Sequence, residues 1–247
     1  MMIKTKRKGD YLEIIIPEKW AGLTIEEILK NIYKAPKKLV HEWRMAKDVL
    51  LNGTAAKWTE PLQQGDQLYL PIYKQDSQLP EAAFIDIGIL YEDDDLLIVN
   101  KPAGIETHPS EPGQNQSLLN AVAYHLLIEG ETCELRHIHR LDQDTTGAIL
   151  FSKNAFAGSI LQRMLDERHI KRTYKALVHG KLTKRKGTIS ASIGRDRHHA
   201  TRRRVAPTGQ KAVTHFETLH YDKKNNLTLV QCTLDTGRTH QIHVQLN

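Results

Sequence analysis

The sequence predicts an α+β protein in which helices pack on a mixed, mostly antiparallel β-sheet. Beyond residue 84, candidate strands outnumber candidate helices, which is typical of antiparallel sheets. The candidate helices carry their apolar residues on one face, as helices that cover a sheet do. With 247 residues, 40% of them hydrophobic, the chain is long enough to form a substantial core.

Residues 1–75 are predicted to form a small α/β domain. Thr24 and Glu27 stand three residues apart, the spacing of a capping box at a helix start, and the Asn52-Gly53 pair is typical of a hairpin turn. The expected elements are a strand at 11–16, a helix from Ile25 that ends before Pro36, a helix at 37–47, a strand entering the Asn-Gly turn at 49–54 and a closing strand at 67–73.

A polar linker is expected at residues 76–84, and a second domain at 85–247. Ser117 and Asn154 are expected to cap two amphipathic helices, the first of which ends at Gly130. The expected strands of this domain span residues 85–91, 96–99, 148–151, 174–178, 188–193, 212–219, 227–234 and 239–246.

The distribution of charge predicts a polyanionic partner. The net charge is +6, but the stretch from Lys171 to Lys211 alone carries thirteen Lys or Arg residues and one acid, Asp196. Such an excess repels itself unless a ligand neutralises it, so RNA or DNA is expected.

The remaining composition indicates a cytoplasmic protein. Cys133 and Cys232 are the only cysteines and form no CxxC pair, so neither a disulfide framework nor a thiolate zinc site is indicated. The basic start is followed by no apolar segment of a signal peptide, and no apolar run is long enough for a membrane span. The sequence does not indicate an oligomer, and a monomer is favoured.

One polar cluster is placed where catalytic groups concentrate. His139-Arg140-Leu141-Asp142 precedes a turn containing Gly147 and then an apolar strand, so Asp142 is expected on a loop held by rigid elements. The alternative is a structural Arg-Asp pair at a turn.

These residues, followed by Thr145-Thr146-Gly147, resemble the His-Arg-Leu-Asp-x-x-Thr-Ser-Gly signature of the RluA/RluD-type pseudouridine synthases. Three further stretches resemble that family in the expected order, and the resemblance runs from about residue 84 to the end. The stretches are Asn100-Lys101-Pro102-Ala103-Gly104 with His108-Pro109, Lys171-Arg172-Thr173-Tyr174-Lys175-Ala176, and Gly237-Arg238-Thr239-His240-Gln241-Ile242.

The resemblance implies an RNA isomerase that needs one ionised carboxylate and no cofactor. It assigns this role to Asp142, which attacks the sugar, attacks the base or removes a ribose proton; the sequence leaves all three open. Arg238 is implied as the cation beside the carboxylate, and Tyr174 as the active-site tyrosine that stacks on uracil. Either ribosomal or transfer RNA fits as substrate.

RNA contacts are implied in both predicted domains. Arg140 resembles the arginine that enters the RNA stack when the target nucleotide flips out, and His139, Lys171 and Arg172 are expected nearby. Residues 1–75 resemble a ribosomal-protein-S-four-like (αL) RNA-binding domain, whose helix pair would present Lys37, Lys38 and Arg44 to RNA. The alternative is a small packing module with an ordinary solvated surface.

The sequence departs from the family pattern at Thr146, in place of serine, and at His243, in place of arginine, which puts a phosphate contact in doubt. The chain also stops inside an expected core strand, so a truncated end is expected. Two other function classes stay open: an RNA-binding protein with an inactive catalytic domain, and a metal-dependent hydrolase with ligands among His137, His139, Asp142, His240 and His243.

Overall fold

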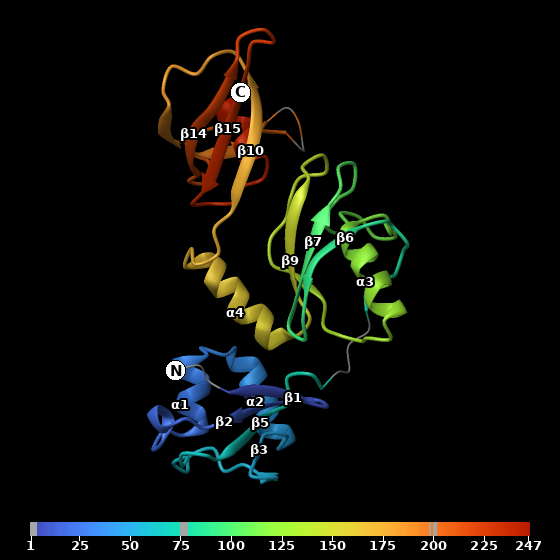
Figure 1. Ribbon diagram of the computed structural model, residues 1–247, viewed down its shortest axis with the longest axis vertical. Helices are drawn as coiled ribbons and strands as arrows, with labels where there is room; N and C mark the ends of the chain where they lie inside the picture. Colours follow the sequence, from blue (N-terminus) through green and yellow to red (C-terminus); the bar gives the residue numbers. More distant parts are fainter. Residues whose placement is uncertain (1–3, 75–78, 198, 200–201) are drawn as a thin grey trace. The chain divides into compact units, whose positions relative to one another are not determined.

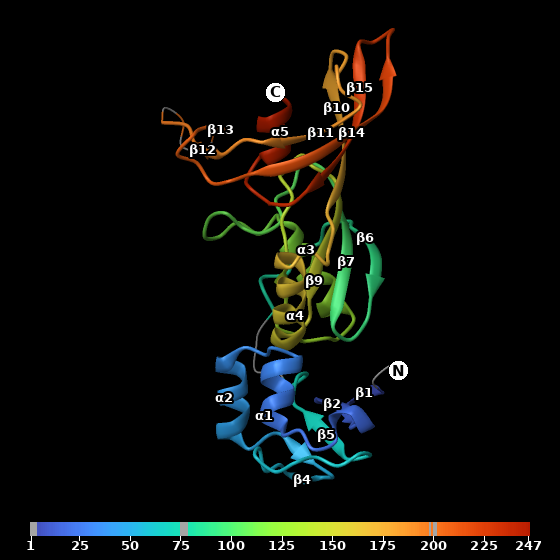
Figure 2. The ribbon, with the colours of Figure 1, turned by 90° about the vertical axis from the view of Figure 1, so that its left-hand side faces the viewer.

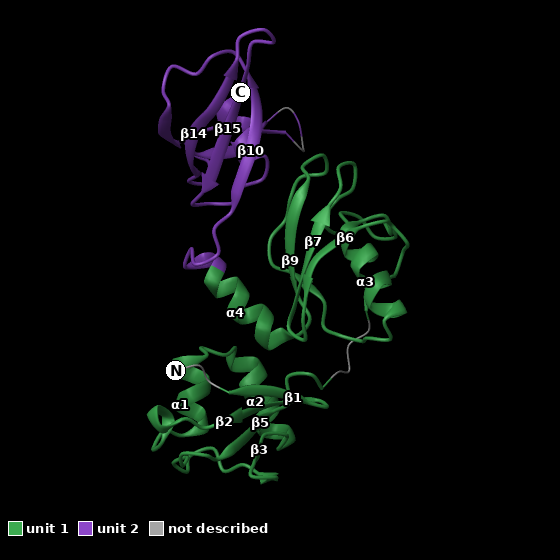
Figure 3. Cartoon of the chain, in the orientation of Figure 1, with its two compact units in different colours: residues 1–164 green, residues 165–247 purple. Residues whose placement is uncertain are grey.

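The computed structural model describes residues 4–74, 79–197, 199 and 202–247. These residues form two compact units, 1–164 and 165–247 (Figures 1 and 3). The predicted α+β class is confirmed, because every strand pair within the described sheets is antiparallel and helices accompany the sheets. The expected linker at 76–84 lies partly outside the described residues.

The first sheet has the strand order β1-β2-β5-β3-β4. Asn52 and Gly53 form the predicted turn between β3 and β4, with φ angles of 50° and 84°, which a two-residue hairpin turn of this kind requires. The strands are β1 Thr5–Lys8, β2 Tyr11–Ile15, β3 Leu50–Leu51, β4 Thr54–Ala55 and β5 Gln67–Leu70.

The predicted capping box is present at Thr24, directly before the first α-helix. The backbone N–H of Thr24 donates to Glu27 Oε2 (2.8 Å), and the backbone N–H of Glu27 donates to Thr24 Oγ1 (3.2 Å). This helix widens after one turn, because the N–H of Tyr33 donates to the carbonyl of Ile28, five residues back. The helical segments are the 3₁₀ turn η1 Glu18–Trp20, α1 Ile25–Glu27, the π-helical turn η2 Ile28–Ile32, and α2 Lys37–Ala46.

The second sheet has the order β6-β7-β9-β8, and Figure 2 shows its two helices, α3 and α4, on the same side of β6 and β7. Asn154 caps α4 as predicted, since its Oδ1 accepts from the N–H of Ala157 (2.7 Å). Ser117 is the N-cap residue of α3, and its N–H donates to Asn120 Oδ1 (3.2 Å). The elements are β6 Gly88–Glu92, β7 Leu96–Lys101, α3 Leu118–Ile128, β8 Arg136–His137, β9 Gly147–Ser152 and α4 Ala155–Asp166.

Helix α4 contributes to the core of the N-terminal sheet and helices. Phe156 is 4% exposed and belongs to the same apolar cluster as Trp43, with Ile160 packed against it. The ring centroids of Phe156 and Trp43 are 5.8 Å apart. Arg163 Nη1 donates to the carbonyl of Tyr33 (2.5 Å). The first seventy residues are therefore joined to the second sheet through packing and not only through the chain.

The second unit is built on a four-stranded sheet with the order β10-β15-β14-β11 and a separate hairpin, β12-β13. Predicted strand 227–234 is confirmed at its bounds, and the other predicted strands before residue 235 are present with shifted ends. The elements are β10 Thr173–His179, β11 Lys186–Ser190, β12 Ile193–Arg195, β13 Arg203–Val205, β14 Val213–Asp222, β15 Leu227–Leu234 and α5 Gln241–Leu246.

The prediction of a last strand at 239–246 is wrong, because this segment forms helix α5. His240 has a φ of 56° and turns the chain out of the extended conformation. The side chains of Gln241 and Gln245, four residues apart, then make hydrogen bonds to the backbone of the neighbouring strands and loops. Alternating apolar residues suggested a strand, but the polar pair at helical spacing determines which face is buried.

Candidate active site

Asp142 lies in the loop between β8 and β9, at the predicted turn. The N–H of Thr145 donates to the carbonyl of Asp142 (3.0 Å), which closes the turn, and Asp142 is half-buried. The flanking strands both belong to the second sheet, so the carboxylate stands on a short loop between hydrogen-bonded strands.

Lys101, the last residue of β7, is completely buried and anchors this loop. Lys101 Nζ donates to three carbonyl oxygens, those of Pro102 (2.9 Å), Ile105 (2.7 Å) and Gln143 (2.7 Å). Burial lowers the pKa of the Lys101 ammonium, while the nearby carboxylates of Asp144 and Asp142 oppose this change. Lys101 thus joins the loop after β7 to the residue that follows Asp142.

Thr107 fixes the residue on the other side of Asp142. Its hydroxyl donates to the carbonyl of Leu141 (3.0 Å) and accepts from the N–H of Leu141 (3.1 Å). Gly104 N–H donates to the carbonyl of Gln143 (3.0 Å), whose side-chain amide donates to the carbonyl of Gly104 (3.1 Å). Hydrogen bonds therefore fix the backbone on both sides of Asp142, so the carboxylate is attached to a well-defined backbone position.

The residues that precede Asp142 in the chain, His137, His139 and Arg140, have different surroundings. His139 is half-buried, and its Nε2 accepts from the N–H of Leu150 (3.3 Å), while Arg140 is exposed. The rings of His137 and His108 stack, with centroids 4.6 Å apart and planes 12° apart. Burial lowers the pKa of both stacked imidazoles, and the positive charge of Arg140 lowers each pKa further. Burial and the charge of Arg140 thus both favour the neutral form of the two rings.

Tyr174, Arg172 and Arg238 all lie in the second unit. Tyr174 is the second residue of β10 and pairs in register with Cys232 of β15. Arg172 lies directly before β10, and a Cβ added at Gly237 would overlap its guanidinium, so the side chain of Arg172 occupies the space beside Gly237. Two of the motif stretches, around Lys171-Arg172 and around Gly237-Arg238, therefore meet in this unit.

Gln241 holds the loop that carries Arg238. Its Oε1 accepts from the N–H of Arg238 (3.0 Å), and its Nε2 donates to the carbonyl of Val213 (3.1 Å) and to Thr214 Oγ1 (2.9 Å). Gln241 is 3% exposed, so these bonds satisfy a buried amide. The guanidinium Nε of Arg238 donates to the carbonyl of Lys211 (3.2 Å).

Lys101 and Gln241 lie within the family-like motifs, but neither was assigned a role from the sequence. Each carried a signal: Lys101 is a lysine at the end of an apolar strand, followed at once by a Pro-Gly loop, and Gln241 follows the proposed catalytic arginine by three residues. Asp142 lies in the first unit and Arg238 in the second, so the pairing of these two residues stays a prediction.

Two of the three basic residues predicted on the N-terminal helix pair, Lys37 and Arg44, line a groove of about 400 Å³ between α1 and α2, together with Lys30, Lys34 and His41. Lys37 and Lys38 are exposed. Arg44 forms an ion pair with Glu26 (2.8 Å), and its guanidinium lies 4.7 Å from the centre of the Trp58 ring. Lys37 and Arg44 thus share one concave surface, and the ion pair partly neutralises Arg44.

Among the residues that the structure describes, no three His, Cys, Asp or Glu side chains are grouped as ligands of one metal ion. The metal-dependent hydrolase therefore has no ligand set in the described part of the chain. No described helix has both the length and the apolar character of a membrane span.

Comparison with known proteins adds two family matches. Residues 95–247 match the RNA pseudouridylate synthase family, and residues 12–68 match the N-terminal domain of the RluD ribosomal pseudouridine synthase. Two relatives match almost the whole chain. The uncharacterised RNA pseudouridine synthase YhcT of Bacillus subtilis is 45% identical over 97% of this chain and 80% of its own length. The ribosomal large subunit pseudouridine synthase D of Nitrosomonas europaea is 36% identical over 95% of this chain and 68% of its own.

A solved structure is also similar. The human RNA pseudouridylate synthase domain containing 1 superposes with a TM-score of 0.54 and 25% identity, over 65% of this chain and 64% of that chain.

Proposed function

Because the chain belongs to the RNA pseudouridylate synthase family, we propose that it isomerises specific uridines of ribosomal RNA, with Asp142 as the reactive carboxylate and without a cofactor. The observation that supports this role is the fixed loop around Asp142, whose two neighbours are held by Thr107 and Lys101. A carboxylate that must meet a flipped nucleotide gains from a backbone that needs no reorganisation.

The reaction breaks the bond between uracil N1 and the anomeric carbon of ribose, turns the base, and joins the same carbon to C5 of uracil. The proton at C5 then leaves and N1 takes up a proton, so the product is an isomer of uridine and no electrons are gained or lost. Asp142 attacks the sugar, attacks the base or removes a ribose proton, and each route requires the ionised carboxylate. In our proposal Arg238 supplies the cation that keeps Asp142 ionised, and Gln241 holds the Arg238 loop.

Tyr174, Arg140 and their neighbours complete the proposed site. Tyr174 stacks on the uracil ring, and Arg140 takes the place of the flipped nucleotide in the RNA stack, which suits a planar and exposed guanidinium. Arg172, held beside Gly237, and Lys171 contact the phosphate backbone near the target.

The RNA class is proposed from the comparisons and from the N-terminal surface. The relative from Nitrosomonas europaea is named for the large ribosomal subunit, and residues 12–68 match the N-terminal domain of the RluD ribosomal pseudouridine synthase. The groove between α1 and α2 offers Lys37 and Arg44, with Lys38 exposed beside it, to structured RNA. A ribosomal substrate also fits the cytoplasmic location expected from the sequence.

Pseudouridine mapping tests this proposal. RNA from cells with and without the gene is treated with a carbodiimide that marks pseudouridine and is read by primer extension. We expect one or a few marks to disappear from large-subunit ribosomal RNA and to return when the wild-type gene is restored. Loss of marks from transfer RNA alone would contradict the ribosomal substrate, and unchanged maps of both RNAs would contradict the function.

A further inference from the structure

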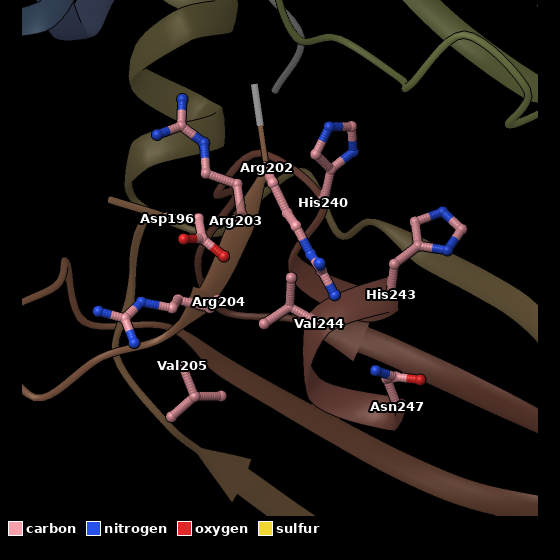
Figure 4. A pocket seen from close by; sticks show the side chains of 9 residues that line it. All are labelled: Asp196, Arg202, Arg203, Arg204, Val205, His240, His243, Val244 and Asn247. Carbon is pink, nitrogen blue, oxygen red and sulfur yellow. The ribbon is translucent and has the colours of Figure 1, made fainter. Parts of the chain in front are cut away.

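A second basic cavity lies within the unit of residues 165–247, and the chemistry proposed above does not use it. The cavity has a volume of about 750 Å³ and lies where strand β13 meets helix α5. Figure 4 shows the side chains that line it: Asp196, Arg202, Arg203, Arg204, Val205, His240, His243, Val244 and Asn247.

Both walls of this cavity are held by hydrogen bonds. In the β12-β13 hairpin, Arg203 pairs in register with Arg195, and the N–H of Asp196 donates to the carbonyl of Arg202 (2.9 Å). On the other wall, Gln245 of α5 donates to the carbonyls of Ala191 (3.2 Å) and Ala212 (3.1 Å). These two carbonyls lie on segments that lead into and out of the hairpin, so α5 and β13 are tied to the same backbone.

The lining carries far more positive than negative charge. The lining includes three consecutive arginines and two histidines but one carboxylate, that of Asp196. Within the described part of the chain, none of these three arginine side chains forms an ion pair or a hydrogen bond. The Nε of Arg203 is buried and has no acceptor among the described residues. A buried N–H in a folded protein normally has an acceptor, so this wall is suited to an anionic ligand.

We propose that this cavity binds a phosphodiester group of the substrate RNA. Guanidinium groups match phosphate oxygens in geometry and charge. Val205, which is 52% exposed, and Val244 place apolar surface beside the cations, which suits the ribose on either side of a phosphate. This inference rests on the proposed function, since it requires an RNA substrate, and it adds an anchoring site to it.

The cavity also accounts for a departure from the family pattern. His243 stands where the family that the chain resembles has arginine, and a phosphate contact at that position was in doubt. Arg202, the residue directly before β13, extends toward α5 (Figure 4) and so brings a guanidinium to the same cavity from the opposite wall. The phosphate contact is thus made from the hairpin, with His243 beside it.

The test compares the double variant Arg202→Gln/Arg204→Gln with Lys223→Gln/Lys224→Gln in the full-length protein. Both remove two positive charges from exposed positions of the same unit, but Lys223 and Lys224 lie in the turn between β14 and β15, outside the cavity. Binding to an in vitro transcript of large-subunit ribosomal RNA is measured from about 50 to 200 mM salt, with thermal unfolding as a check of folding.

We expect the arginine pair to weaken binding roughly ten-fold at about 100 mM salt and to flatten the plot of log affinity against log salt by about one to two units. The lysine pair should change both quantities much less. Equal losses in the two pairs would mean that only net charge matters, and an unchanged salt slope in the arginine pair would mean that the cavity does not touch RNA; either result overturns the inference.

Two further measurements are made. The first distinguishes RNA binding in the cavity from the binding of a free anion, and the second measures turnover separately from binding. Titration with inorganic phosphate, at constant ionic strength, shows whether the cavity takes a free anion; phosphate binding with an unchanged RNA salt slope also overturns the inference. Release of tritium from the same transcript, labelled at C5 of uridine, tests the ribosomal substrate separately. The cavity is judged on binding alone, so failure of turnover by the wild type would contradict the proposed function and not the cavity.

Discussion

Lys101 anchors the loop that carries Asp142, and one substitution can remove this anchor. Replacing it with methionine keeps the length of the side chain but removes the ammonium donor from the carbonyls of Pro102, Ile105 and Gln143, of which Gln143 keeps its bond from the N–H of Gly104. The loss of three hydrogen bonds from a charged donor in a partly buried site is costly, so we expect Lys101→Met to lower the free energy of unfolding by about 2–4 kcal/mol. Urea unfolding followed by circular dichroism measures this.

The control for Lys101→Met is Lys224→Met, on an exposed turn, which should change stability little. Lys101→Met should also slow turnover at saturating RNA, because the backbone beside Asp142 loses its anchor. Stability and turnover equal to those of the control would show that the three carbonyls do not need the ammonium.

The stacked imidazoles of His108 and His137 give the fold a defined response to acid. Each has its pKa lowered in the folded state, mainly by burial, so the unfolded chain binds more protons between that pKa and the ordinary value of about 6.5. The stability contributed by the neutral rings is therefore complete above about pH 6.5 and is lost as pH falls through the folded-state pKa.

We expect His137→Asn to lose less stability between pH 7.5 and pH 5 than the wild type does, because one of the two rings no longer has to be protonated on unfolding. Thermal unfolding midpoints across this range measure the effect. His220→Asn, at an exposed position in β14, is the control and should follow the wild type. If His137→Asn also follows the wild type, the buried pair does not determine the acid response.

The elements of this protein differ in how far the sequence predicted them. The capping box at Thr24, the Asn-Gly turn and the caps at Ser117 and Asn154 were predicted because each depends on bonds between near neighbours in the chain. Helix α5 was not, because its conformation depends on carbonyls at Ala191, Ala212 and Val213 that only the folded sheet places beside Gln241 and Gln245. Lys101 was missed for the same reason, since its three acceptors become visible only in the fold.

A substitution in helix α4 shows how far the stability of the N-terminal core depends on this helix. Phe156→Ala removes a buried ring from the core that also contains Trp20 and Trp43, so we expect a loss of about 3–5 kcal/mol. The three tryptophans, Trp20, Trp43 and Trp58, all lie within residues 1–75, so their fluorescence reports on that part of the chain. The urea midpoint of tryptophan fluorescence should fall in Phe156→Ala.

Ile128→Ala is the matched control for Phe156→Ala, because Ile128 ends α3 and is 62% exposed. It should leave the fluorescence midpoint unchanged. A midpoint that also stays unchanged in Phe156→Ala would mean that the N-terminal core is stable without α4. The packing also means that removing residues 1–75 exposes Phe156 and Ile160, so substitutions at Lys37 and Lys38 are the cleaner test of RNA binding by this part.

The residues with proposed functions are spread along the whole chain. Asp142 and its anchors lie in the first unit, while Tyr174, Arg238 and the cavity between β13 and α5 lie in the second. The basic groove between α1 and α2 is a third candidate for RNA contact. A long, structured RNA can engage several such surfaces at once, so affinity and chemistry should separate in variants.

The assignment of the chemistry to Asp142 is tested by comparing Asp142→Asn with Asp144→Asn. The two carboxylates lie in the same turn, both act on the buried Lys101, and each substitution replaces one charge with an amide of equal size. Tritium release from large-subunit ribosomal RNA labelled at C5 of uridine is measured for both, together with RNA affinity. We predict that Asp142→Asn loses at least about a thousand-fold in turnover while its affinity stays within a few-fold, and that Asp144→Asn keeps most of its turnover. Appreciable tritium release by Asp142→Asn, or an equal loss in both variants, would contradict the assignment of the chemistry to Asp142.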